Sequence, residues 1–520
     1  DWSSDVCSSD LSLAALKTRL LEIDDLQQAG RLLEWDQAAF MPPGGAPARG
    51  RHMATLARLA HERFVDAETG RLLDAAAAET ASLPFESDEA SLVRVTRRAW
   101  EEAVKLPVSL VSEIQEHGAH SYQAWTVAKP ANDFATMRPI LERTLDLSRR
   151  MAECFPGHDH IADPLIDFSD YGMKAATVKT LFADLRRQLV PLVRAITSRP
   201  VTDDACVRQH APEAEQLAFG LEVIERFGFD FTRGRQDKTP HPFMTKFSLG
   251  DVRITTRVRE DEITDALFST LHESGHAMYE MGIDRSFEGT PLAQGTSSGV
   301  HESQSRLWEN LVGRSRGFWE HFLPILQRRF PQQLGAVSLD TFHAAINKVE
   351  RSLIRTDADE VTYNLHVMLR FDLELDLLEG KVAVKDLADV WRARFEADFG
   401  IPVPDDTRGV LQDVHWYAGR IGGVFQGYTL GNILSAQFHA SAVQAHPSIP
   451  DEIRRGTFGT LHGWLRENVY RHGAKFTASE LVPRATGSEL RLEPYLDYLW
   501  GKYQPLYGLR ADERMPSGVA

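Results

Sequence analysis

The chain has 520 residues, of which 43% are hydrophobic and 25% charged, a balance typical of a globular protein with a large core. Its 74 acidic and 58 basic side chains give a net charge of -16, and no basic tract offsets it, which argues against nucleic acid or an anionic membrane surface as a partner. No apolar run approaches the roughly 20 residues that cross a bilayer, so we expect a soluble protein.

The first residues, DWSSDVCSSDL (1–11), differ from the rest of the chain. They lack apolar periodicity and also the basic and apolar regions of a signal peptide. They coincide with one reading frame of a common sequencing adapter, so we expect 1–11 to be a translated artefact and 12–520 to be a single domain. Beyond this stretch only Cys154 and Cys206 remain, too few for a disulfide framework, and a reducing cytoplasm is the expected compartment.

From Leu13 onward, apolar residues recur mostly at helical spacing, as in LKTRLLEIDDLQQAGRLLEWDQ (16–37) and VKTLFADLRRQLVPLVRAI (178–196). Prolines and glycines interrupt these runs, but no long Ser/Gly linker separates independent halves. The sequence therefore predicts one large, predominantly α-helical domain.

The main strand pattern is HPFMTKFSLGDVRITTRV (241–258), in which two alternating runs flank Ser248 to Asp251. This pattern predicts a hairpin, or a small sheet, directly before the next helix.

That helix, ITDALFSTLHESGHAMYEMG (263–282), carries an HExxH motif. His272 and His276 are four residues apart and project from one helical face, where two imidazoles can reach the same ion. Zn²⁺ lowers the pKa of a bound water toward roughly 7, and Glu273 lies where it can take the proton during attack on a carbonyl. The alternative is that so short a motif arose by chance on a polar helix face.

A catalytic zinc needs a third protein ligand. The extended metzincin pattern is excluded, because Tyr279 and Gly282 stand where it requires Gly and His. A carboxylate from a following segment is the remaining option, and the candidates are Glu280, Asp284, Glu288, Glu302 and Glu309. Glu302 is favoured because the small-residue stretch before it can turn the chain back toward the HExxH helix. Glu309, two turns later, could support the site from outside the ligand set or be a surface charge.

Several motifs lie in order between about Leu33 and Gly431, and together they are more specific than HExxH. They are EWDQAAFMPPGGAPARG, DVRITTRV, HESGH, HESQSRLWEN, IRTDADEVTYNLH and GVLQDVHW. In these motifs the sequence resembles the carboxypeptidase Taq family of metallopeptidases.

The resemblance implies an almost wholly helical protein with a deep central groove, usually a homodimer. It also implies a metal-dependent carboxypeptidase that releases single C-terminal residues from peptides with broad specificity. Carried over residue by residue, His272, His276 and Glu302 become the zinc ligands and Glu273 the catalytic base. His301 would then be structural. Cobalt is a second candidate metal, because two histidines and a carboxylate accept several ions.

An exopeptidase must also bind the free carboxylate of its substrate, a task suited to arginine. Arg355 is the preferred candidate and Arg253 the second. Arg355 could instead pair with Asp357 or Asp359.

His415 and Tyr428 are candidates for stabilising the oxyanion, and the alternative is that they are buried residues with internal partners. The role of Tyr428 is the less secure, because Gln426 and Gly427 precede it where the family more often has Pro-Thr.

Asp251 and Thr255 could place a strand beside an extended substrate backbone. Alternatively, Asp251 lies in the turn of the hairpin and Arg253 forms a structural ion pair.

Three functions are thus compared: a zinc carboxypeptidase acting on peptides with a free C-terminus, a groove-type zinc oligopeptidase that cuts internal bonds, and a helical binding scaffold without turnover. The first is the prediction.

Overall fold

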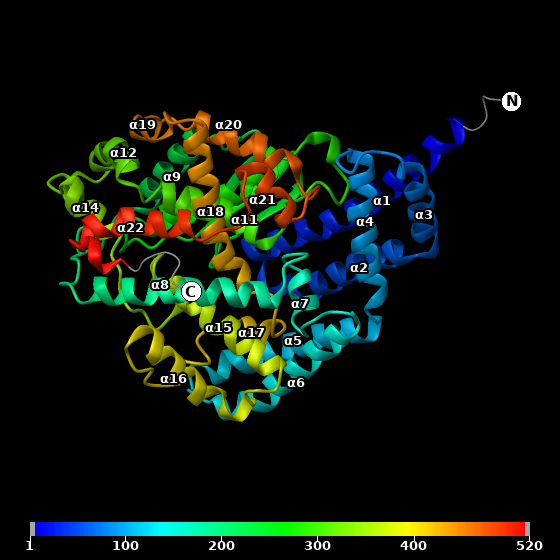
Figure 1. Cartoon of the computed structure of the whole chain (residues 1–520), viewed down its shortest axis with the longest axis horizontal. Helices are drawn as coiled ribbons and strands as arrows, with labels where there is room; N and C mark the ends of the chain where they lie inside the picture. Colours follow the sequence, from blue (N-terminus) through cyan, green and yellow to red (C-terminus); the bar gives the residue numbers. More distant parts are fainter. Residues whose placement is uncertain (1–5, 515–520) are drawn as a thin grey trace.

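The computed structural model describes residues 6–514, and residues 6–11 by their backbone alone (Figure 1). Residues 1–5, part of the stretch expected to be an artefact, lie outside the described residues. The α-helices are α1 (Val6–Ala39), α2 (Ala46–Val65), α3 (Ala67–Thr80), α4 (Asp88–Lys105), α5 (Val108–Ala128), α6 (Phe134–Glu153), α7 (Asp163–Asp167), α8 (Ala175–Thr197), α9 (Glu213–Phe227), α10 (Asp265–Gly282), α11 (Ser298–Arg306), α12 (Arg316–Arg329), α13 (Pro331–Leu334), α14 (Leu339–Ile346), α15 (Tyr363–Leu378), α16 (Leu387–Phe399), α17 (His415–Ala418), α18 (Gln426–Ala445), α19 (Ile449–Arg454), α20 (Gly459–Asn468), α21 (Ala478–Thr486) and α22 (Glu493–Tyr507).

Shorter helical turns connect these elements. They are the 3-10 helices η1 (Pro43–Gly45), η2 (Arg285–Phe287), η4 (Arg355–Asp357), η5 (Val384–Asp386), η6 (Tyr470–His472) and η7 (Ala511–Glu513), and the π-helix η3 (Leu307–Val312). The predominantly helical fold is therefore confirmed. Among residues 6–514, no helix combines the length and apolar content needed to span a bilayer.

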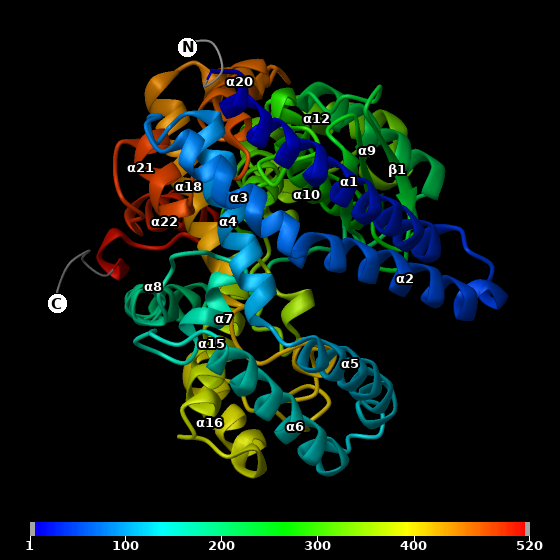
Figure 2. The ribbon, with the colours of Figure 1, turned by 90° about the vertical axis from the view of Figure 1, so that its right-hand side faces the viewer.

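Buried apolar side chains gather in three clusters, and the helices that supply them can be followed in Figure 2. One cluster is built mainly from α5 to α8, α15, α16 and α22, and a second from α9 to α12 and α18 to α21. The third joins α1, α3 and α4. The helix α18 contributes Ile433 to the first cluster and Leu434 to the second, so its two faces join these layers.

The small sheet has the strand order β1-β3-β2, with β1 at Gly234–Lys238, β2 at Met244–Ser248 and β3 at Asp251–Thr256. The antiparallel pair β2 and β3 confirms the expected hairpin. The strand β1 pairs parallel to β3 and was not predicted, because its sequence GRQDK is polar and shows no apolar alternation. Val252 and Ile254 of β3 are fully buried in the same cluster as residues of α10, and this places the sheet beside the HExxH helix.

Close backbone approach fixes α10, α11 and α18 against one another. A Cβ atom at Gly275 of α10 would lie 2.5 Å from the carbonyl oxygen of Gln304 in α11. A Cβ atom at Gly431 of α18 would lie 2.6 Å from both Cβ and Cγ of Glu302. Because glycine has no side chain, these two positions let α11 insert between its neighbours and bring Glu302 toward α10.

Candidate active site

Ser297 lies at the end of the turn that brings the chain back to α10. Its side chain accepts a hydrogen bond from the backbone N–H of Val300 (3.2 Å) and so caps the N-terminus of α11. The stretch GTSSGV thus turns the chain as the sequence suggested, and Glu302 lies within the first turns of the capped helix.

Three side chains converge at the contact between α10 and α11. Glu302 Oε2 lies 3.9 Å from His272 Nε2 and 3.5 Å from His276 Nε2. All three ligand atoms lie within 4.8 Å of one another. Tetrahedral zinc with ligands at about 2.1 Å requires ligand atoms separated by about 3.4 Å, so this donor set fits such an ion with small adjustments. The structure therefore brings together the three residues that the sequence analysis selected.

Partners outside this ligand set orient both imidazoles. His272 Nδ1 donates to Glu309 Oε2 (2.9 Å), so its Nε2 lone pair points toward Glu302. Glu309 lies on the π-helix η3, which continues α11, and π-helical turns recur at functional sites.

A series of side-chain contacts through His301 and Glu280 orients His276. His276 Nδ1 lies 2.6 Å from His301 Nδ1, and His301 Nε2 donates to Glu280 Oε1 (2.9 Å). Glu280 accepts from Nε2 of His301, and the His301 tautomer with its proton on Nε2 has Nδ1 available to accept from His276. The Nε2 atom of His276 is then free to bind a metal. Lys246 of β2 ends this series of contacts with a buried ion pair to Glu280 (2.6 Å). Neither His301 nor Glu280 is part of the ligand cluster, an arrangement consistent with the structural role expected of His301, which stays a prediction.

Burial and charge set the protonation of the ligands. Burial lowers the pKa of His276 to about 4, which keeps it neutral. Burial would raise the pKa of Glu302, but Arg306 and the two imidazoles outweigh it and hold the carboxylate ionised. Burial would lower the pKa of His272, but Glu302 and the hydrogen bond to Glu309 raise it. The site thus presents a carboxylate and imidazoles whose ring orientation suits a cation.

Glu273 follows the first ligand and is 8% exposed. Burial, together with the charges of Glu302 and Glu309, raises its pKa to about 7. The Glu273 carboxylate accepts no hydrogen bond from another residue of the described chain, so both of its oxygens are available to accept a proton. A divalent cation at the ligand cluster would lower this pKa, because a nearby positive charge favours the ionised carboxylate.

A second cluster gathers three predicted residues around Asp413. Arg355 donates from Nε to Asp413 Oδ2 (2.5 Å) and from Nη1 to the hydroxyl of Tyr363 (2.8 Å). His415 Nδ1 donates to Asp413 Oδ1 (2.5 Å), and its Nε2 lies 3.3 Å from the hydroxyl of Tyr428. Arg355 is therefore paired with Asp413 and not with Asp357 or Asp359.

The Asp413 cluster adjoins the ligand cluster through α18. Tyr428 lies one turn before Gly431, which contacts Glu302. The guanidinium of Arg306, which is bonded to Glu302, lies 4.7 Å from the ring centre of Tyr363. Arg355, His415 and Tyr428 thus lie on one side of the candidate metal ligands.

Asp251 and Arg253 lie apart from this cluster and bind each other through two hydrogen bonds of 2.8 and 2.7 Å. The guanidinium of Arg253 also lies 4.3 Å from the ring centre of Trp35. The strand β3 is paired on both sides, by β1 and β2, so its backbone offers no free edge to a peptide. This geometry favours the structural alternative for Asp251 and Arg253. The free edges of the sheet belong to β1 and β2.

A groove of about 690 Å³ is lined in part by residues of β2 and by His301. Its walls come from α1, α4, the strand β2 and the loop before α11, and they include Trp35, Arg98, Met244 and Thr296. An extended peptide could lie in this groove with its backbone parallel to the edge strand.

Sequence reasoning missed Asp413, Tyr363 and Lys246, although all three lie within motifs or runs that it quoted. The signal for Asp413 was its place two residues before His415. Its link to Arg355 spans 58 residues of chain and is visible only in the fold.

Two imidazoles and a carboxylate around one point, with an uncommitted glutamate next to the first candidate ligand, match the residue set expected of a mononuclear metallohydrolase of the HExxH class. Residues 15–503 match the family model described as carboxypeptidase Taq (M32) metallopeptidase. The chain belongs to this family and is a metallocarboxypeptidase.

Relatives support this assignment along nearly the whole chain. The thermostable carboxypeptidase 1 of Thermus thermophilus is 40% identical over 493 residues, which cover 93% of this chain and 96% of that protein. Carboxypeptidase 1 of Bacillus subtilis is 33% identical over 94% of this chain and 97% of that protein. The crystal structure of an M32 carboxypeptidase from Deinococcus radiodurans R1 superposes with a TM-score of 0.94 and 52% identity, covering 96% of this chain and 100% of that one.

Proposed function

We propose that this metallocarboxypeptidase uses zinc, held by His272, His276 and Glu302, to release single C-terminal amino acids from peptides with broad specificity. The observation that carries the proposal is the convergence of the two Nε2 atoms on Glu302 Oε2, at 3.9 and 3.5 Å. A bound zinc ion would polarise the scissile carbonyl and make a water more acidic.

Glu273 is the proposed general base. Its carboxylate is buried, adjacent to the first ligand in sequence and free of hydrogen bonds to the described residues. It can therefore take a proton from the attacking water and pass it to the leaving amine.

Arg355 is the proposed receptor for the substrate's terminal carboxylate. Asp413 engages its Nε atom and Tyr363 its Nη1 atom, so the guanidinium plane is fixed while Nη2 keeps its donors for a ligand. A fixed guanidinium loses little conformational entropy when it binds a carboxylate.

His415 and Tyr428 are the proposed donors to the oxyanion. Burial would raise the pKa of Asp413, but Arg370, His415 and Arg355 hold this pKa far below its usual range. The Asp413 carboxylate accepts from Nδ1 of His415 and so fixes a proton on that atom. A ring that also carries a proton on Nε2 would donate an N–H from that atom, and the Tyr428 hydroxyl, 3.3 Å away, offers an O–H as the other donor.

A time course on one peptide, supplied with a free C-terminus and as the amide, tests the proposal. Mass spectra should show stepwise loss of single C-terminal residues from the free peptide and resistance of the amide. Internal fragments without stepwise shortening would favour the oligopeptidase, and no cleavage of either peptide by the metal-loaded protein would favour a binding scaffold.

Metal analysis of the same preparation tests the metal. We expect one zinc per chain, loss of activity on dialysis against a chelator, and recovery when zinc or cobalt is restored.

A further inference from the structure

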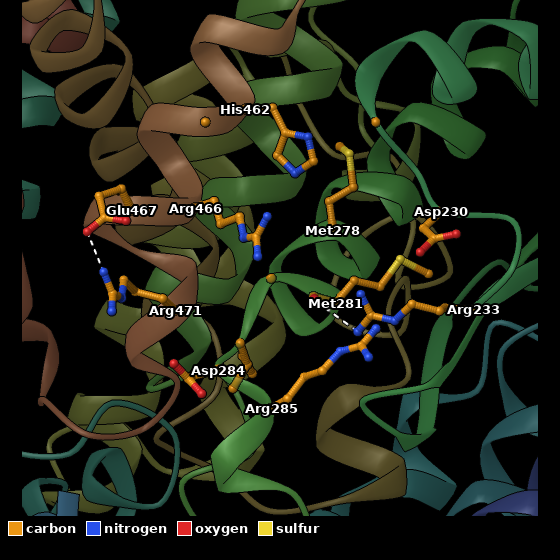
Figure 3. A pocket seen from close by; sticks show the side chains of 14 residues that line it. Asp230, Arg233, Met278, Met281, Asp284, Arg285, His462, Arg466, Glu467 and Arg471 are labelled. Atoms are coloured by element: carbon orange, nitrogen blue, oxygen red, sulfur yellow. Dashed lines mark hydrogen bonds and ion pairs between the residues drawn. The ribbon is translucent and has the colours of Figure 1, made fainter.

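A second cavity, of about 890 Å³, opens at the C-terminal end of α10 and contains none of the proposed catalytic or metal-binding residues. Its lining comes from the segment before β1, the end of α10, η2 and α20 (Figure 3). We propose that this cavity is a binding site for a small molecule carrying an oligophosphate group, separate from the proposed peptide site.

Three guanidinium groups line this cavity, and each has N–H donors without a hydrogen-bond acceptor in the described chain. Figure 3 shows Arg466 on one side and Arg233 with Arg285 on the other. Within residues 6–514, the side chains of Arg285 and Arg466 make no hydrogen bond or ion pair. Arg233 donates from Nε to the carbonyl of Leu249 (3.0 Å) and from Nη2 to the carbonyl of Met281 (3.0 Å), which anchors the side chain and leaves Nη1 unused.

The carboxylates at the rim are already engaged elsewhere. Asp230 accepts from the backbone N–H (2.9 Å) and the hydroxyl (2.6 Å) of Thr232. Asp284 accepts in the same way from Ser286, at 3.0 and 2.8 Å, and caps η2. Glu467 is paired with Arg471 one helical turn away. The acidic side chains therefore hold local structure, and no carboxylate is bonded to the three guanidinium groups.

Like charges held together in this way repel one another. Burial and the charge of Arg285 lower the pKa of Arg233, and Arg466 adds to the effect, while the carboxylates of Asp230 and Glu288 act in the opposite direction without cancelling it. A chain with a net charge of -16 has ample carboxylates to neutralise three arginines, yet no carboxylate of residues 6–514 forms an ion pair with any of the three. A bound anion would relieve the repulsion.

The arrangement of the groups selects the class of anion. Guanidinium forks bind phosphate oxygens through paired hydrogen bonds. Figure 3 shows Arg466 on one side of Met278 and Arg233 with Arg285 on the other, so one ligand must present negative charge at two places. A chain of linked phosphates does so, and the methionines and the ring of His462 can pack against an organic part. The cavity volume lies within the range of small-molecule sites.

Calorimetric titration of the metal-loaded protein with inorganic pyrophosphate tests the site. The variants are Arg285→Gln and Arg466→Gln, and the matched control is Arg408→Gln, an exposed arginine that is paired with Asp405 and does not line the cavity. We expect saturable binding that weakens with added salt, an affinity about tenfold lower in each cavity variant, and an unchanged affinity in the control. Pyrophosphate bound at the active-site metal would contribute equally in all four proteins.

Chemical modification locates the site without a variant. Phenylglyoxal should modify Arg285 and Arg466 in the wild-type protein, and pyrophosphate should protect these two residues but not Arg408, as read by peptide mass mapping. Wild-type protein that shows no saturable binding, folded cavity variants that bind as tightly as wild type, or equal modification with and without pyrophosphate would overturn the proposal.

Discussion

Glu309 Oε2 lies 2.9 Å from Nδ1 of His272, so a carboxylate outside the proposed ligand set fixes the ring of a ligand. Arg306 and Arg314 hold Glu309 in turn, at 3.3 and 3.4 Å. The hydrogen bond to His272, followed by the charges of these arginines, offsets the effect of burial and lowers the pKa of Glu309 to about 2. The imidazole therefore faces a full negative charge, which increases its basicity toward a metal.

Replacing Glu309 by Gln should weaken metal binding by about 10- to 100-fold, because the amide can still hold the ring but no longer supplies the charge. Competition with a chromophoric chelator measures the affinity directly. Glu62→Gln, which changes an exposed carboxylate on α2, is the matched control and should bind metal as wild type does. Equal affinities for Glu309→Gln and the control would show that Glu309 does not act on the metal.

Replacing Glu273 by Gln should abolish hydrolysis and leave metal content unchanged, because the amide cannot accept the proton from water. General-base catalysis contributes typically about 10²- to 10⁴-fold, so kcat should fall by at least about 100-fold. Single-turnover kinetics combined with metal analysis of the same sample separates the two effects. Unchanged kcat in a fully metal-loaded variant would refute the assignment of the base.

Replacing Arg355 by Gln should selectively impair cleavage of peptides with a free C-terminus. Loss of a buried charge-to-charge contact costs about 2 kcal/mol or more, so kcat/KM for a free peptide should fall by about 30-fold or more. The amidated peptide offers no carboxylate, and its slow cleavage should change little.

Arg253→Gln provides the comparison, because Arg253 is already bound to Asp251 on the hairpin. The ratio of kcat/KM for free over amidated peptide should collapse in the Arg355 variant and persist in the Arg253 variant. The reverse pattern would make Arg253 the carboxylate receptor.

Replacing Gly275 by Ala should damage both stability and metal binding. The new methyl group would meet the Gln304 carbonyl oxygen at 2.5 Å and Ser305 Cα at 2.7 Å, and backbone atoms cannot move aside without separating α10 from α11. Overpacking of this kind costs about 1–3 kcal/mol. Urea unfolding of the metal-free protein and the chelator assay measure the two effects.

Gly30→Ala is the matched control, because a Cβ atom at this position in α1 meets nothing within 4 Å. This replacement should leave metal affinity unchanged and stabilise the helix slightly. A Gly275→Ala protein as stable and as tightly metal-bound as the Gly30→Ala protein would contradict the close approach.

The sequence predicted those parts of the molecule that depend on local patterns. Apolar spacing indicated the helices, and alternation indicated the hairpin of β2 and β3. The strand β1 was not predicted, because its pairing with β3 depends on tertiary contacts and not on its own polar residues. In the candidate site, His272 and His276 follow from helical spacing, and Glu302 from a turn and a resemblance. In the Asp413 cluster, Arg355 contacts Asp413 across 58 positions of sequence, and local periodicity carries no information about such a contact. The expected homodimer, the cytoplasmic location and the artefactual origin of residues 1–11 stay predictions.

The stability of the protein should depend on Glu374 between about pH 5 and pH 8. Glu374 is 1% exposed and accepts a hydrogen bond from Trp416 Nε1 (2.8 Å). Burial raises its pKa from 4.5 to about 7, although Trp416 and Arg370 act in the opposite direction. Because the native state holds this proton more tightly than the unfolded chain, the free energy of unfolding falls as the pH rises from about 4.5 to 7.

Glu374→Gln removes this titration and keeps an amide that resembles the protonated acid. The variant should match wild type near pH 5 and be more stable at pH 8, by at most about 3 kcal/mol, the free energy that corresponds to the change in pKa. Urea unfolding of both metal-loaded proteins at the two pH values measures the difference, and the effects of all other titrating groups cancel. A variant that loses as much stability as wild type between pH 5 and pH 8 would show that Glu374 is already ionised in the native protein at the lower pH.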